Sequence, residues 1–511
     1  MDFGKYLSIL AATNSEKTAF YYKDEWISYE QLEHSSASLA RWFIQQGCKP
    51  GDRVTLHWPN SIDMVTLLFA CFKAGLIAVP VNVRLKAPEV AYLLGHSKPS
   101  ISFAHSELFG ATEEAYRDVT SCRRVQFSLP YLASSNAQLP TVNDDDPALI
   151  LYTSGTTARP KGVMHTHRTL LESAKLVTDA ESASMQTVLV MTQMAFISAI
   201  SCILSGVLAG GTCVLVRAFD APQVLDAIER FQCTFTFGLP SMAQMLIEEQ
   251  QRNPRQVRSL RTFLAGGDAV PEILQQQFQL FFGIVLRELF GMTEIGPAIW
   301  NPPDDIRSGS LGKPPNTVEV RVVDSKGKEV RDGQIGEIVV RGPANFVGYW
   351  DDPAATRDAV RGGWMYTGDL GRRDEDGYVW FEGRKKEIIV RDGINIAPQD
   401  VEAVLVRHPA VLEAAVIGVP DPIPARGERV IAFVCLRDRV DATGAELREH
   451  AAQSLADFKV PEKVILVKSL PKGVTGKIQR RALRENLVHY GVFDSPLPLG
   501  VGTNSDDLLR V

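Results

Sequence analysis

One short segment of the chain concentrates hydrogen-bond donors. Four hydroxyl side chains, a glycine and a lysine fall within nine residues, directly after the apolar run Ala148–Tyr152. Donors at this density can bind an anion that carries several oxygens, and a polyphosphate fits them best. A loop that follows a parallel strand is also where ligands usually bind in α/β proteins. The sequence therefore predicts a polyphosphate site made of Thr153, Ser154, Gly155, Thr156, Thr157 and Lys161.

The segment is not one of the common phosphate-binding loops. It lacks the G-x-x-x-x-G-K-[ST] spacing of a Walker A loop, and no G-x-G-x-x-G follows a predicted strand in the chain. A polar surface loop is the alternative interpretation of the same residues. The position of the segment directly after a predicted parallel strand favours the ligand site over this alternative.

Five segments, in their order and spacing, resemble the motifs of the adenylate-forming superfamily. This superfamily includes acyl-CoA synthetases, peptide-synthetase adenylation domains and luciferases. The match extends from about residue 10 to about residue 490, which makes a chance match very improbable. The segments are the hydroxyl-rich loop, Phe290–Glu294, Tyr366–Asp369, Gly383–Glu387 and Pro471–Ile478.

The resemblance implies a reaction in two steps. A carboxylate attacks the α-phosphorus of ATP, expels pyrophosphate and forms an acyl-adenylate. The thiol of CoA then displaces AMP and gives a thioester. Catalysis of this kind depends mainly on positioning and on stabilising charge at phosphate oxygens. The chain is therefore expected to use ATP, Mg²⁺ and CoA.

The resemblance also implies roles for single residues. Thr153 and Lys161 would hold the departing phosphates, and Glu294 would bind Mg²⁺ through a hard oxygen ligand. Lys477 would neutralise the α-phosphate, so Lys477, Glu294 and Thr153 are the expected catalytic residues. Phe290 would stack on adenine, and Asp369 would accept the ribose hydroxyls. Further ATP contacts are expected from Gly267, Asp268, Gly291, Met292, Thr293 and Arg384.

The second step needs a different arrangement of the C-terminal domain. In the superfamily this domain swings about a hinge residue, which is Lys386 by position. The movement withdraws the loop of Lys477 and brings in a loop whose Gly393 would line the tunnel for the thiol. Both assignments rest on the resemblance.

Two residues depart from the pattern of the superfamily. Ala158 stands where the phosphate loop usually has glycine, which would slow loop closure without preventing it. Phe196 stands where many acyl-CoA synthetases have a histidine near the acyl carboxylate, and no histidine occurs between His167 and His408. Phe196 either alters the acid pocket or simply packs as an apolar substitute.

The expected acid pocket is apolar and has no charged residue that could pair with a polar side chain of the acid. This favours a fatty, alicyclic or aromatic acid. An amino acid would typically need an aspartate for its amine, and Phe235–Phe237 offers none. The pocket residues are Phe196, Phe237, Gly238, Gly267 and Met292.

The predicted function is thus that of an AMP-forming acid–thiol ligase, an acyl-CoA synthetase. Two alternatives stay open. The enzyme could load the acyl group onto a carrier protein instead of CoA, or the chain could be a catalytically silent protein that binds a nucleotide or an acyl-adenylate. A carrier protein and a second copy of the chain are further partners that the sequence leaves open.

Composition excludes other classes of function. With 54 basic and 60 acidic residues the net charge is −6, which gives no basic footprint for nucleic acid. The seven cysteines form no close pair, and the first residues lack the apolar core of a secretory signal. We therefore expect a cytoplasmic protein with reduced thiols.

One uncharged stretch, Ser182 to Val216, is long enough to cross a bilayer. Gly210 and Gly211 interrupt it, and Thr212–Val216 then has the pattern of a buried strand. We therefore expect a buried helix followed by a strand, and no integral membrane span.

The elements that must position these residues follow a βαβ rhythm. Strands are predicted at Arg53–His57 and Ile77–Val81 around a helix at Ser61–Lys73, which implies a parallel sheet covered by helices. The rhythm recurs from Gly211 to Phe237. Beyond about residue 310, short strands joined by glycine turns, such as Val318–Val323, predict an antiparallel subdomain.

The predicted fold class is α/β. A large N-terminal domain would contain two parallel-sheet α/β subdomains and a small antiparallel β subdomain, followed by a small mobile C-terminal α/β domain with helices at Pro398–Val406 and Gly444–Leu455. The predicted boundaries are 1–384 for the AMP-binding (adenylation) domain, 385–492 for the C-terminal domain and 493–511 for a flexible tail.

Overall fold

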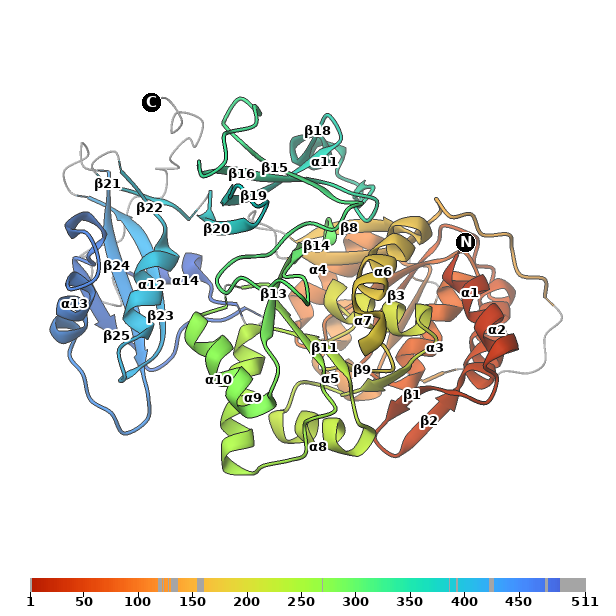
Figure 1. Cartoon of the computed structure of the whole chain (residues 1–511). Helices are drawn as coiled ribbons and strands as arrows, with labels where there is room; N and C mark the ends of the chain where they lie inside the picture. Colours follow the sequence, from red (N-terminus) through yellow and green to blue (C-terminus); the bar gives the residue numbers. More distant parts are fainter. Residues whose placement is uncertain are drawn as a thin grey trace. The chain divides into compact units, whose positions relative to one another are not determined.

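The computed structural model describes residues 2–117, 122, 124–126, 128–129, 137–153, 160–268, 270–385, 387–391, 394–421, 427–473 and 477–487. The chain divides into two compact units (Figure 1). The first is Met1–Val320 with Val340–Met365, and the second is Arg321–Val339 with Tyr366–Val511. The predicted boundary after Arg384 stays a prediction, and the predicted tail lies outside the described residues.

The first sheet of the first unit carries the hydroxyl-rich segment. Strands β3, β4, β5, β6 and β7 pair in parallel, and β8 and β17 extend the sheet in antiparallel fashion. The predicted parallel architecture is therefore confirmed here. In spatial order the strands are β17 (Gly348–Tyr349), β8 (Lys161–Thr166), β7 (Pro147–Thr153), β4 (Ile77–Pro80), β3 (Arg53–His57), β5 (Ile101–Ala104) and β6 (Arg124–Gln126).

The second sheet of this unit carries the other N-terminal motifs. Strands β13, β12, β11, β9, β10 and β1 are parallel neighbours, with antiparallel β14 and β2 at the two edges. In spatial order the strands are β14 (Gly296–Trp300), β13 (Leu286–Met292), β12 (Thr262–Gly266), β11 (Phe235–Gly238), β9 (Thr187–Val190), β10 (Thr212–Leu215), β1 (Thr18–Tyr22) and β2 (Glu25–Ser28).

Helices connect the parallel strands, as the βαβ rhythm requires. Some begin at a side-chain cap: the Ser61 hydroxyl accepts the Met64 amide at the start of α3, and the Asp220 carboxylate accepts the Gln223 amide at the start of α8. The helices are α1 (Phe3–Thr13), α2 (Tyr29–Gln45), α3 (Ile62–Lys73), α4 (Ala87–Ser97), α5 (Ser106–Arg117), α6 (His167–Glu181), α7 (Ile197–Leu208), α8 (Ala221–Phe231), α9 (Pro240–Arg252), α10 (Glu272–Phe282) and α11 (Pro353–Ala359).

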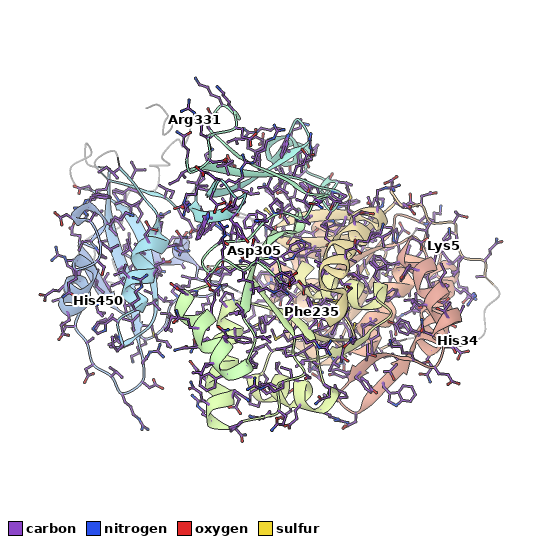
Figure 2. The ribbon with its side chains drawn as sticks, in the orientation of Figure 1. Lys5, His34, Phe235, Asp305, Arg331 and His450 are labelled. Carbon is purple, nitrogen blue, oxygen red and sulfur yellow. The ribbon has the colours of Figure 1, made fainter. Side chains whose placement is uncertain are left out.

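The uncharged stretch forms the predicted helix and strand. Helix α7 ends at Leu208, and β10 begins at Thr212 within the second sheet. In the part of the chain that the structure describes, no helix has the length and apolar character needed to span a membrane. The side chains in this region pack inside the unit: Phe235 of neighbouring β11, labelled in Figure 2, is fully buried.

The boundary between the units passes through a small sheet of short strands. Strand β19 pairs in antiparallel fashion with β18 and with β20, as predicted for this region. The strands are β15 (Glu319–Val323), β16 (Gly336–Arg341), β18 (Val360–Arg361), β19 (Trp364–Arg373) and β20 (Val379–Arg384).

The rest of the second unit is a small α/β fold with its own apolar core. Strand β24 pairs in antiparallel fashion with β23 and in parallel with β25, and β21 and β22 form a hairpin. The elements are β21 (Ile389–Arg391), β22 (Ile394–Ile396), α12 (Pro398–Val406), β23 (Val411–Pro420), β24 (Glu428–Leu436), α13 (Gly444–Ala452), β25 (Lys463–Leu466) and α14 (Arg480–Glu485).

A buried ion pair anchors β13, the strand that leads into the Phe290–Glu294 motif. The guanidinium of Arg287 lies 2.6 Å from the carboxylate of Glu181, with side chains 6% and 3% exposed. Arg287 also donates to the Asn301 carbonyl and to Thr262 Oγ1. Because both charges are desolvated, neither can lose its partner without leaving a buried charge uncompensated.

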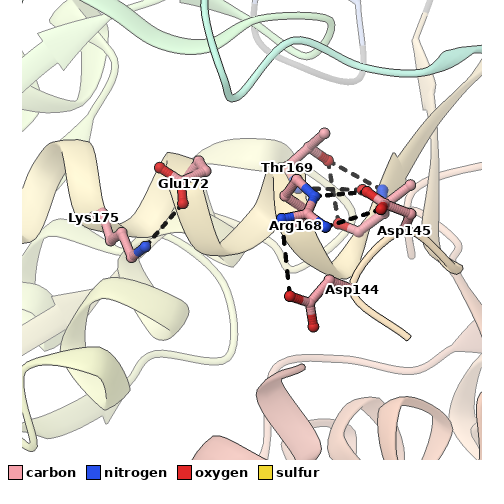
Figure 3. A network of polar contacts seen from close by, with 7 residues as sticks. Asp144, Asp145, Arg168, Thr169, Glu172 and Lys175 are labelled. Carbon is pink, nitrogen blue, oxygen red and sulfur yellow. Dashed lines mark hydrogen bonds and ion pairs between the residues drawn. The ribbon is translucent and has the colours of Figure 1, made fainter. Parts of the chain in front are cut away.

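We expect Glu181→Ala to lower the free energy of unfolding by about 3–5 kcal/mol, the usual cost of leaving one buried charge unpaired. Urea denaturation of the purified chain measures this. The exposed pair between Arg168 and Asp145, 2.6 Å apart at the start of α6, is the control (Figure 3). Asp145→Ala should leave the unfolding midpoint nearly unchanged because solvent screens this pair. Equal effects of the two substitutions would contradict the assigned role of the buried pair.

Candidate active site

The hydroxyl-rich segment joins two antiparallel strands. Thr153, at the end of β7, pairs with Lys161, at the start of β8. Because β7 is parallel to β4, the segment leaves the carboxyl edge of a parallel sheet, as predicted. The Tyr92 hydroxyl of α4 donates to the carbonyl of Pro160, the residue before β8. This bond connects α4 to the hairpin that β7 and β8 form. The predicted residues Ser154, Gly155, Thr156 and Thr157, together with Ala158, lie outside the described residues.

Glu294 lies in the turn between β13 and β14 and is only 6% exposed. Its carboxylate Oε1 accepts a hydrogen bond of 2.9 Å from the hydroxyl of Tyr349, and its carbonyl accepts one of 2.7 Å from the Phe346 amide. Burial, reinforced by the charge of Glu294, raises the pKa of Tyr349, so this hydroxyl stays protonated and donates.

The ring of Tyr349 also faces the phosphate segment. The Nζ atom of Lys161 lies 4.8 Å from the centroid of this ring, within the range of a cation–π contact. Lys161 and Glu294, predicted to bind phosphates and metal, are thus brought to one aromatic side chain, although they belong to different sheets. The sequence prediction did not include Tyr349.

His165 supports the same turn from β8. Its Nε2 lies 2.8 Å from the Thr293 carbonyl and must donate to it, and its Nδ1 lies 3.0 Å from Thr169 Oγ1. Burial lowers the pKa of His165 to about 4, so the imidazole is neutral near pH 7. The sequence analysis also missed this residue.

The predicted adenine-binding segments lie at the ends of two neighbouring parallel strands, after β12 and over the last residues of β13. Gly266 ends β12 and pairs with Leu289 of β13, one residue before Phe290. Gly267 has φ +88°, a conformation that favours glycine, and turns the chain away from the sheet. Phe290 is buried, whereas Gly267 and Asp268 are exposed. The assignments of Gly267, Asp268, Phe290, Gly291, Met292 and Thr293 to ATP stay predictions.

The predicted acid pocket lies along the same edge of this sheet. Because β9, β11, β12 and β13 are parallel, the residues at or after their ends lie along one edge: Phe196 before α7, Gly238 at the end of β11, Gly267 after β12 and Met292 at the end of β13. A Cβ on Gly238 would lie 2.2 Å from Met191 Cε, so this face of β11 packs closely. The half-buried Phe237 ring points to the other face, beside Gly266.

One further acid lies in β13, two residues before Phe290. Glu288 is buried, and desolvation raises its pKa to about 8, although the amide of Val270 stabilises the charged form. Glu288 is therefore largely neutral at pH 7 and adds little charge to this edge of the sheet.

In the second unit, Asp369 of β19 pairs in register with Arg384 of β20. Arg384 Nε lies 3.2 Å from Asp369 Oδ1, and Asp369 is 8% exposed. Burial raises the pKa of Asp369, while the positive charges of Arg384 and Lys477 oppose the shift. Asp369 and Arg384 are thus brought together by adjacent strands, and Lys477, distant in the sequence, lies near enough for its charge to act on Asp369.

The loop that carries Lys477 is closed at its base by a backbone hydrogen bond. Lys477 accepts this hydrogen bond of 2.8 Å from the Gly473 amide through its carbonyl. The predicted hinge Lys386 and the predicted tunnel residue Gly393 lie outside the described residues. Their roles stay predictions.

Glu294 fits the donor chemistry of a magnesium site. It offers a hard carboxylate oxygen in a buried turn that a hydroxyl and an amide hold. Within the ranges that the structure describes, no group of three or more acidic, imidazole or thiol side chains could hold a metal. Mg²⁺ is commonly bound by one or two carboxylates together with substrate phosphates and water, which suits Glu294.

Comparisons with known proteins find relatives along nearly the whole chain. The family described as AMP-binding enzyme matches residues 9–350, and its C-terminal domain matches residues 400–477. A sulfoacetate–CoA ligase from Cupriavidus necator is 34% identical over 89% of this chain and 92% of its own length. The fatty acid–[acyl-carrier-protein] ligase ScoC from Streptomyces coeruleorubidus is 33% identical over 90% of this chain and 91% of its own length.

A solved structure extends the likeness to three dimensions. The anthranilate CoA ligase AuaEII, in complex with anthranoyl-AMP, matches with a TM-score of 0.88 and 28% identity. The match covers 95% of this chain and 96% of that one.

We expect Lys477→Ala to reduce pyrophosphate release from ATP at least about 100-fold, because a cation that neutralises charge in the transition state is removed. Conversion of supplied acyl-adenylate to thioester should fall much less. Both half reactions are measured separately by chromatography. Lys468→Ala, at an exposed lysine in the same unit, should change neither. Equal loss of both half reactions in Lys477→Ala would contradict the role.

Proposed function

We propose that this chain, which belongs to the family of AMP-binding enzymes and is an acid–CoA ligase that uses ATP, acts on an apolar acid: fatty, alicyclic or aromatic. The resemblance seen in the sequence is confirmed, as is the prediction of an AMP-forming acid–thiol ligase. The silent binding protein considered as an alternative is therefore not favoured.

The observation that supports an apolar acid is the character of the pocket edge. Phe196, Phe237 and Met292 supply half-buried apolar side chains where the parallel strands end. None of the predicted pocket residues carries a charge. A charged group on the acid would lose its hydration there without gaining a partner, which costs several kcal/mol.

The relatives alone do not choose the acid class. One comparably similar relative is named for sulfoacetate, a polar acid, and another for fatty acids, while the AuaEII structure holds an aromatic acyl-adenylate. The proposal of an apolar acid therefore rests on the side chains of the predicted pocket in this chain.

In the proposed first step, the carboxylate of the acid attacks the α-phosphorus of ATP and pyrophosphate leaves. Thr153 and Lys161, with the segment between them, bind the departing phosphates, and Glu294 binds Mg²⁺. The magnesium ion neutralises phosphate charge when it is bound. Asp369 accepts the ribose hydroxyls, Arg384 donates to ribose or phosphate, and Lys477 contacts the α-phosphate.

In the proposed second step, the thiol of CoA attacks the acyl carbon and AMP leaves, giving the thioester. For this step, the C-terminal domain would turn about Lys386. The turn would bring Gly393 to the path of the thiol. A carrier protein with a pantetheine thiol is the second candidate acceptor, because ScoC, named for such a carrier, is 33% identical to this chain.

The acid class is tested by pyrophosphate release with a panel of acids, with and without CoA. The panel runs from short to long fatty acids and includes benzoates, an alicyclic acid and sulfoacetate. We expect kcat/KM for the best apolar acid to exceed that for sulfoacetate at least about 100-fold, because burying the sulfonate without a partner costs several kcal/mol. Thioester should form when CoA is present.

The same assay separates the alternatives. Thioester on a carrier protein but not on CoA would favour the second acceptor. A preference for sulfoacetate would contradict the apolar pocket while leaving the ligase activity intact.

Phe196 gives a sharper test of the pocket. We expect Phe196→Ala to raise KM for the preferred acid about tenfold, equivalent to about 1.4 kcal/mol of lost apolar contact, while KM for ATP stays the same. Steady-state kinetics measures both constants. Trp26→Ala, at a 54% exposed ring in β2, is the control and should change neither. An unchanged KM for every acid would show that Phe196 merely packs.

A further inference from the structure

One aromatic side chain contacts both of the charged groups assigned above to ATP and its metal. The hydroxyl of Tyr349 donates to Glu294 Oε1 at 2.9 Å, and Lys161 Nζ lies 4.8 Å from the centroid of its ring. The motifs from which the site was predicted do not include Tyr349. The two contacts use different parts of the side chain. The hydroxyl can therefore be removed while the ring stays, and the loss of both can be compared with that change.

Backbone hydrogen bonds hold the segment around Tyr349 to β8, the second strand of the hairpin that β7 and β8 form. Tyr349 pairs with Val163 of β8, and the Trp350 amide donates to the Gly162 carbonyl at 2.7 Å. The Tyr349 amide donates to Thr356 Oγ1 of α11 at 2.9 Å. A side chain fixed in this way can in turn fix the groups that it touches.

The same segment holds the turn that carries Glu294. The Phe346 amide donates to the Glu294 carbonyl at 2.7 Å, and the Phe346 ring packs edge-on against Tyr349, with centroids 4.9 Å apart. Glu294 is therefore held by its backbone and by one carboxylate oxygen from a single short segment. A hydrogen bond to a carboxylate restricts the directions in which the carboxylate can offer its oxygens to a cation.

We propose that Tyr349 is a positioning residue that sets the carboxylate of Glu294 for Mg²⁺ and the ammonium of Lys161 for the phosphates. The inference rests on the proposed function, because it takes the roles of Lys161 and Glu294 from it. The hydroxyl serves the metal carboxylate and the ring serves the lysine. If Tyr349 has this role, the gain in ATP affinity that Mg²⁺ gives should depend on the Tyr349 hydroxyl.

Calorimetric binding of ATP to the full chain, in excess Mg²⁺ and in excess chelator, tests this without turnover. Tyr349→Phe keeps the ring and removes the hydroxyl, so affinity without Mg²⁺ should stay within about twofold of wild type. The gain in affinity that Mg²⁺ gives should fall about tenfold, because the carboxylate is no longer held. Tyr349→Leu should also weaken binding without Mg²⁺ about fivefold, because Lys161 loses the ring.

Two further variants make the test specific. Glu294→Gln should remove most of the gain from Mg²⁺, and adding Tyr349→Phe to it should cause no further loss if the hydroxyl acts through this carboxylate. Tyr29→Phe is the matched control, since Tyr29 is a buried tyrosine whose hydroxyl donates to the Gly211 carbonyl at 2.6 Å. It should bind ATP as the wild type does under both conditions.

The outcomes are distinguishable. A full gain from Mg²⁺ in Tyr349→Phe, or independent losses in Tyr349→Phe and Glu294→Gln, would overturn the positioning role while leaving the proposed function intact. If the wild-type chain binds no ATP under either condition, the proposed function fails and the inference fails with it. If Tyr349→Leu does not fold, as thermal unfolding would reveal, Tyr349→Phe and the double variant still decide.

Discussion

Burial of the Glu294 carboxylate constrains much of the first unit. A charge taken out of water costs several kcal/mol unless donors replace its hydration, and Glu294 is 6% exposed. One such donor is the hydroxyl of Tyr349, which belongs to the other sheet. Tyr349 lies in β17, which pairs with β8, the strand that starts at Lys161. One desolvated acid therefore links the two sheets at the predicted phosphate end of the site.

The second unit also contains a buried carboxylate, which is compensated by positive charges. Asp369 is also buried, but its partner Arg384 comes from the adjacent strand, and the charge of Lys477 comes from a distant loop. The acid is held in place, yet its pKa stays raised by burial. A ribose would offer Asp369 two hydroxyl donors, which matches the role proposed for it.

The sequence predicts the strands and helices whose bounds depend on local patterns of residues. Strand β3 and helix α12 have the predicted bounds, because apolar periodicity and the proline of the first turn act locally. Helix α13 ends at Ala452 and not at Leu455, although Leu455 still packs on the core. The contact of Tyr349 with Glu294 was missed because it joins positions 55 residues apart, and a tyrosine between a glycine and a tryptophan has no chemical signature. Strand order likewise depends on long-range pairing.

In the proposed reaction, this chain makes an acyl-adenylate and passes it to a thiol. Mass spectrometry after one turnover, with enzyme, ATP, Mg²⁺ and the preferred apolar acid but without CoA, would detect that intermediate. We expect close to one acyl-AMP per active chain, which disappears on addition of CoA as acyl-CoA and AMP appear in equal amounts. Formation of ADP and phosphate in place of AMP and pyrophosphate, or acyl-AMP that persists with every thiol, would contradict it.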